Sequence, residues 1–247
     1  MASRIKSLFR NLVIYGLGDV ATSLVSFLLL PLYTRYLAPA DYGVIAMLLT
    51  IEAVAKIVFR WGVDTAFMRL YFDCRDTASR QRLASTIFFF LLAINGSLVL
   101  ASVAASGWLS RTLLGTPNQG LLVALVIANT FVTSFYFIPL QVLRIGERSG
   151  QFIALVFARS AATLVARLVL VIALHKGVLG IVLADVVVTT IYSVVLSRWF
   201  LPLVRPVFSR PILREALAFG LPRIPHSIAS QVIGLADRYF LRAYRSL

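Results

Sequence analysis

Residues 42–66 read YGVIAMLLTIEAVAKIVFRWGVDTA, a stretch long enough and apolar enough to cross a membrane as one helix. Four charged side chains interrupt it at intervals of four residues: Glu52, Lys56, Arg60 and Asp64. On a helix, positions four apart differ by about 40° around the axis. The spacing therefore predicts a single charged stripe along one face of a transmembrane helix.

A stripe of this kind is unfavourable toward lipid. A Lys, Arg or Asp at the centre of a membrane helix costs about 2.5–3.5 kcal/mol, whereas each Leu, Ile, Val or Phe contributes about −0.3 to −0.6 kcal/mol. The ten such apolar residues between Tyr42 and Val63 offset only about 3–6 kcal/mol, less than three central charges cost. We expect the stripe to face a watery interior enclosed by other helices.

The composition of the whole chain predicts a polytopic membrane protein. Its 247 residues are 60% hydrophobic and 14% charged, more apolar than a soluble domain of this length can bury. The net charge of +14 does not predict a nucleic-acid partner, because apolar runs separate the basic residues and no RNA-binding motif is present. With one cysteine and no metal-ligand spacing, we expect no internal disulfide, metal site or cofactor.

Apolar segments predict an all-α membrane protein with about seven transmembrane helices. They lie at about 12–33, 42–66, 84–106, 121–143, 152–174, 177–197 and 217–237. The first is too long for a signal-peptide core and is expected to be a retained helix. A tight turn is expected at His175-Lys176-Gly177.

Loop charges predict the orientation of these helices. With the N-terminus in the cytoplasm, inner loops hold thirteen Lys and Arg residues and outer loops hold three. This ratio follows the positive-inside rule. Only the residues after the last segment, Arg238, Arg242 and Arg245, would lie outside against the rule.

The first and last segments resemble each other, which indicates an internal repeat. Gly16-Leu17 recurs as Gly220-Leu221, and two serines in each segment align. We expect residues 1–200 to form a six-helix lobe. Residues 201–247 would form a cytoplasmic linker and the first helix of a second, truncated lobe. Repeats of this kind place the substrate site at their interface, near the bilayer midplane.

Three stretches carry a resemblance to a known family: FLLLPLYTRYLAPADYGVIAM at 27–47, WGVDTAFMRLYFD at 61–73 and FGLPRIPHSIASQVIGLADRYFL at 219–241. They resemble the bacterial oligosaccharide flippases, the Wzx-type polysaccharide exporters of the multidrug/oligosaccharidyl-lipid/polysaccharide flippase superfamily. Members of that family have a dozen or more helices. The chain is therefore expected to be an N-terminal fragment.

The resemblance implies a transporter in the bacterial cytoplasmic (inner) membrane, not an enzyme. Its substrate would be undecaprenyl-pyrophosphate-linked oligosaccharide, moved to the periplasmic leaflet by alternating access for O-antigen, capsule or exopolysaccharide synthesis. Expected partners are this lipid-linked oligosaccharide, membrane lipids and a glycan polymerase or other export machinery. A net-positive polar cavity would suit the anionic head group.

Charged residues within the predicted helices are the candidates for the substrate path. They are Glu52, Lys56, Arg60, Asp64, Arg159, Arg167 and Arg223. The alternative for the first four is mutual pairing, because Glu52–Lys56 and Arg60–Asp64 are i,i+4 partners. Arg159 could instead extend toward the inner surface. Arg223 lies between Pro222 and Pro225, where the helix is expected to bend or unwind.

Asp19 and Asp185 are isolated acids in the predicted helices. Each would either bind a coupling ion or pair with a nearby arginine, and pairing is the favoured interpretation. Three other functions stay open. They are a cation-coupled drug exporter of the same superfamily, a transporter fragment that is inactive or depends on a partner lobe, and a membrane enzyme of glycan assembly. A basic lumen argues against the first, and no nucleophile–base or metal grouping supports the last.

Overall fold

The structure, a computed structural model, describes residues 33–115, 117–146 and 148–230. Every regular element in these ranges is a helix. Five helical segments are long enough and apolar enough to cross a membrane: Pro39–Asp73, Thr77–Ala104, Gly120–Ile145, Gly150–Ala173 and Gly177–Phe200. They confirm the predicted all-α membrane fold. The helix expected at 12–33, with Asp19, and the end of the one at 217–237 lie outside the described residues.

The helix expected as one unit at 42–66 is broken. Helix α2 (Pro39–Arg60) begins after Ala38, whose backbone N–H donates to Asp41 (3.0 Å). It ends where Trp61 (φ 50°) and Gly62 (φ 67°) adopt left-handed backbone conformations, and α3 (Val63–Asp73) follows. The prediction of one continuous charged helix is therefore wrong, since Asp64 lies in the first turn of α3.

A buried asparagine satisfies the polar groups that this break exposes. Asn95, which is 0% exposed in α4 (Thr77–Ala104), donates from its side-chain nitrogen to the backbone oxygen of Phe59 (2.6 Å). Its side-chain oxygen accepts from the indole N–H of Trp61 (3.0 Å). Because the last carbonyls of a helix have no intrahelical donor, Asn95 supplies one from another helix.

Asp76 caps the N-terminus of α4 in the loop outside the membrane spans. Its carboxylate accepts from the backbone N–H of Ser79 (3.1 Å). Hydrogen bonds from the Ser79 side chain and backbone hold the pKa of Asp76 below its ordinary value of 3.8. A carboxylate with a lowered folded-state pKa stabilises the protein above its unfolded-state pKa, and this contribution disappears as the pH falls through the folded value.

Replacement of Asp76 by Ala is therefore expected to lower the melting temperature of the detergent-solubilised protein near pH 7 by about 2–4 °C. The difference between wild type and variant should vanish as the pH falls below 3.8. Scanning fluorimetry across a pH series measures the melting temperatures of wild type and variant, and so the difference between them at each pH. A difference that persisted at low pH would mean that the carboxylate charge does not contribute.

Short helices and turns connect the remaining spans. α5 (Ser106–Leu114) precedes α6 (Gly120–Thr133), and a turn at 134–136 leads into α7 (Phe137–Ile145). The expected single helix at 121–143 is thus interrupted. α8 (Ser149–Arg167) continues into a wider π-helical turn at Leu168–Ala173. Positive φ angles at His175 (49°) and Gly177 (55°) confirm the tight turn before α9 (Gly177–Phe200).

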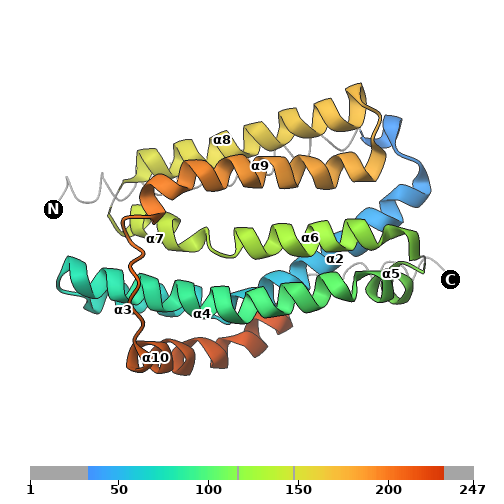
Figure 1. Cartoon of the computed structure of the whole chain (residues 1–247). Helices are drawn as coiled ribbons and strands as arrows, with labels where there is room; N and C mark the ends of the chain where they lie inside the picture. The colour runs from blue at the N-terminus through green and yellow to red at the C-terminus, as the bar shows by residue number, and fades with distance from the viewer. Residues whose placement is uncertain (1–32, 116, 147, 231–247) are drawn as a thin grey trace.

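The helices form a bundle with α8 and α9 side by side along one edge (Figure 1). α6 packs on α9, α2 and α4, while α10 (Arg210–Gly220) lies against α3 and α4 at the opposite edge (Figure 1). A core at this edge joins α3, α4, α7 and α10. Its buried residues include Val63, Phe67, Leu83, Ile87, Ile138 and Ala216.

The segment before α10 is attached to α4 by hydrogen bonds. The Gln81 side chain donates to the Pro202 oxygen (2.9 Å), and the Arg205 backbone N–H donates to the buried Ser85 hydroxyl (2.7 Å). After α10, residues Leu221–Arg223 form a 3-10 turn and helix resumes at 224–230. The helix expected from 217 therefore begins seven residues earlier, and its α-helical geometry is interrupted by a 3-10 turn near Arg223.

Candidate functional site

Three cavities share Glu52 and Lys56 of α2 in their linings. The first, of about 370 Å³, lies among α2, α6, α8 and α9. The second, of about 550 Å³, lies between α2 and residues 224–230, and the third, of about 300 Å³, lies among α2, α6, α7 and α8. The charged face of α2 therefore borders hollow space, as its cost toward lipid predicts.

The four charges of the predicted stripe pair with one another. Lys56 Nζ lies 2.6 Å from Glu52 Oε1, and Arg60 Nη1 lies 3.5 Å from Asp64 Oδ2. The second pair bridges the break between α2 and α3. Both pairs also line the second cavity, so pairing and exposure to the cavity occur together.

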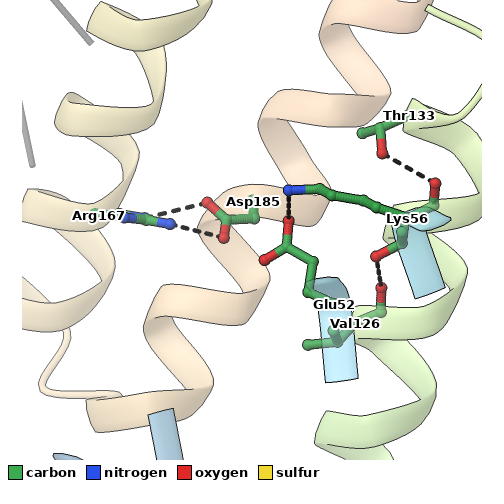
Figure 2. Close-up of polar contacts among 7 residues, drawn as sticks. Glu52, Lys56, Val126, Thr133, Arg167 and Asp185 are labelled. Atoms are coloured by element: carbon green, nitrogen blue, oxygen red, sulfur yellow. Dashed lines mark hydrogen bonds and ion pairs between the residues drawn. The ribbon is translucent and has the colours of Figure 1, made fainter. Parts of the chain in front are cut away.

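Arg167 and Asp185 form a two-point ion pair between α8 and α9. Arg167 Nε donates to Asp185 Oδ1 (3.1 Å), and Nη2 donates to Oδ2 (2.8 Å). Figure 2 shows this pair beside the Glu52–Lys56 pair, and both pairs line the first cavity. Asp185 thus has the arginine partner that the favoured interpretation expected.

Arg159 is held by aromatic rings instead of an acid. Its guanidinium carbon lies 5.1 Å from the ring centre of Tyr136 and 5.4 Å from that of Tyr192. Among the described residues, no carboxylate lies within ion-pair distance of Arg159. It lines both the first and the third cavity.

Arg223 is placed differently from the other candidates. It is exposed at the end of the 3-10 turn and lines none of the three cavities. The following residues, Ile224, His226, Ser227 and Ser230, line the second cavity instead.

Several lining residues were missed by the sequence analysis. Arg144 lies on α7 and lines the third cavity, with its guanidinium 4.9 Å from the Phe152 ring centre. From the sequence alone, Arg144 is expected among the inner-loop charges, because the apolar segment at 121–143 ends just before it. Asn129 and Gln141 also line the cavities. Each is an isolated amide within an apolar predicted helix, and this pattern is the sequence signal that points to them.

The cavity linings carry more positive than negative charge. Among the described residues, five cations line the three cavities: Lys56, Arg60, Arg144, Arg159 and Arg167. Three described acids do so: Glu52, Asp64 and Asp185. In the described ranges, no group of three His, Cys, Asp or Glu side chains is arranged to hold a metal ion. The site is therefore a polar, net-positive interior suited to an anion.

Solved structures with a similar fold are transporters. An outward-facing MATE multidrug resistance transporter of the MOP superfamily has a TM-score of 0.75 and 16% identity, covering 92% of this chain and 53% of its own. A MATE in complex with MaD3S has a TM-score of 0.73 and 18% identity, and the match covers 92% of this chain and 54% of the MATE chain. A MOP superfamily transporter from Pyrococcus furiosus has a TM-score of 0.67 and 16% identity, and the match covers 90% of this chain and 51% of the transporter chain.

These similarities show the fold, and the chain spans about half the length of each of these proteins. No curated protein shows significant similarity to the chain. A protein-family model does match most of the sequence. Residues 32–240 fit the family described as polysaccharide biosynthesis protein. The chain, with a MOP-superfamily transporter fold and a net-positive interior, belongs to the polysaccharide biosynthesis protein family.

Proposed function

We propose that the protein moves undecaprenyl-pyrophosphate-linked oligosaccharide across the bacterial inner membrane, from the cytoplasmic to the periplasmic leaflet, by alternating access. The observation that carries this proposal is the net charge of the lining, in which the described residues supply five cations against three acids, in a chain of the polysaccharide biosynthesis family. The product would be an oligosaccharide available for O-antigen, capsule or exopolysaccharide assembly.

The physical basis is the barrier that a pyrophosphate meets in the bilayer. An ionised group is strongly disfavoured in hydrocarbon, whereas a polar interior with fixed cations stabilises it. The cavities beside α2 provide such an interior among helices that are long and apolar enough to cross a membrane. The apolar lipid chain can remain in the bilayer while the head group crosses.

The proposal includes a two-lobe arrangement. Residues 1–200 would form one lobe, and residues 201–247 would be the cytoplasmic linker and first helix of the next. The similar structures are about twice as long as this chain, and this length supports the proposed second lobe. The loop charges support a cytoplasmic N-terminus.

Drug export is the second candidate, because the similar structures include multidrug transporters. A cationic drug, however, would meet the net-positive lining and be repelled. In addition, Asp185 is paired with Arg167, so a cationic substrate would have to compete with that arginine for the carboxylate. The charge of the lining therefore favours an anionic substrate.

Combined neutralisation of Lys56, Arg60 and Arg167 to Ala tests the proposal. In the full-length protein, glycan export in a flippase-deficient strain should fall at least about tenfold, because three cations of the lining are lost. Arg111→Ala with Lys176→Ala removes two exposed cations outside the cavities and serves as the control. Unchanged export by the triple variant, at equal membrane abundance, would contradict the proposal.

A further inference from the structure

We propose that Arg159 is the residue that binds the diphosphate group of the substrate, with Tyr136 and Tyr192 holding it in position. This assignment rests on the proposed function, because it names which cation of the lining makes the anion contact. In this assignment Arg159 binds the anion, whereas the other cations of the lining mainly contact side chains of the protein itself.

Arg159 differs from the other four cations of the lining. Arg144 contacts the Phe152 ring and lines only the third cavity, and the remaining three are ion-paired. Lys56, Arg60 and Arg167 each lie within 3.5 Å of a carboxylate oxygen. An incoming phosphate would have to compete with that carboxylate for the same N–H donors. The Arg167 pair is the strongest competitor, because two parallel hydrogen bonds hold it.

Arg159 presents its donors differently. Its contacts are with the Tyr136 and Tyr192 rings, at 5.1 and 5.4 Å. A ring attracts the guanidinium group through its electron-rich face and leaves the five N–H donors able to bond an acceptor. A phosphate has several oxygens that match two parallel N–H donors. Arg159 can therefore bind an anion without giving up an ion pair with any acid in the described part of the chain.

The two tyrosines are fixed in place. The Tyr136 hydroxyl donates to the Thr189 oxygen (2.7 Å) and lies 2.8 Å from the Ser193 hydroxyl. The rings pack edge to face at 5.2 Å, and both are buried. Because the rings do not move freely, the guanidinium is held in a defined position before the anion arrives, which reduces the entropy lost on binding.

The surroundings of Arg159 fit a sugar attached to the diphosphate. The Asn129 and Gln141 side-chain oxygens are buried, with no hydrogen-bond partner among the described residues. Asn129 lines the first cavity and Gln141 the third, and Arg159 lines both. Buried acceptors are stabilised by donors, and sugar hydroxyls supply them. The diphosphate would bind at Arg159, with the adjoining sugar beside these amides.

The test measures binding of inorganic pyrophosphate to the full-length protein in detergent by calorimetry. Arg159→Gln should weaken binding about tenfold or more, and Arg159→Lys should weaken it less, because it keeps the charge but not the planar fork. The matched control is Arg111→Gln, which removes one exposed cation that lines none of the three cavities. It should change the affinity by less than about threefold, since it leaves Arg159 in place.

Flipping of the lipid-linked oligosaccharide is measured in parallel. Weakened binding and flipping in both Arg159 variants, with both largely kept in the control, supports the assignment. If wild-type protein flips the substrate and Arg159→Gln binds pyrophosphate normally, the assignment is wrong while the proposed function stands. If wild-type protein binds pyrophosphate through Arg159 but flips no lipid-linked oligosaccharide, the proposed function fails. Should Arg159→Gln not fold, an affinity for Arg159→Lys equal to wild type would overturn the assignment.

Discussion

Replacement of Gly62 by Val is expected to displace α10 from α3 and to destabilise the protein strongly. A side-chain carbon at this position would clash with the backbone oxygen of Gly220, and Gly62 has a φ of +67°. A β-branched residue with positive φ costs about 1–3 kcal/mol. Overpacking against backbone adds about 1–3 kcal/mol, so the melting temperature should fall by about 5 °C or more.

Gly96→Val is the matched control, because nothing lies within 4 Å of a side-chain carbon built at Gly96. Scanning fluorimetry of the purified proteins in detergent compares the two. Equal melting temperatures for the two variants would show that the chain does not pass this closely at Gly62 and Gly220.

Replacement of Asn95 by Leu is expected to be the second severe change. It leaves the Trp61 indole N–H and the Phe59 backbone oxygen without their partner at a fully buried site. Each unsatisfied buried group costs about 1–3 kcal/mol, so the loss from the two groups together should be about 2–6 kcal/mol. Ser97→Ala, on the exposed side of the same helix, should change stability little.

A double variant separates this hydrogen bond from simple packing. Trp61→Phe removes the indole donor, so the cost of Asn95→Leu should be smaller in that background than in wild type. An equal cost in both backgrounds would contradict a role for the Trp61–Asn95 bond in the break between α2 and α3.

Apolar periodicity was sufficient to predict the membrane helices in the described ranges. It could not predict where α2 ends. The break at Trp61 and Gly62 depends on Asn95 of α4 and on close approach by Gly220, both distant in sequence. A length of apolar sequence contains no information about such contacts. The charge spacing was read as a single-helix stripe for the same reason.

The sequence predicts which charged residues lie within the membrane helices better than it predicts the side chains that those charges contact. The charges at Lys56, Arg159 and Arg167 were recognised because each is costly within an apolar helix. The pair within one helix, Glu52–Lys56, follows from spacing alone. The Arg167–Asp185 pair was not assigned, because periodicity does not fix how two helices rotate toward each other. The tyrosines around Arg159 were missed, since aromatic residues in apolar helices are ordinary packing residues.

Transport by the purified full-length protein in liposomes tests the proposed function most directly. The substrate is a pyrophosphate-linked lipid oligosaccharide placed in the outer leaflet, and a cationic dye is the comparison. Because the lining is net positive, the protein should accelerate movement of the lipid-linked oligosaccharide between leaflets and leave the dye untransported. Transport of the dye, with no movement of the lipid-linked oligosaccharide above protein-free liposomes, would contradict an anion-translocating cavity.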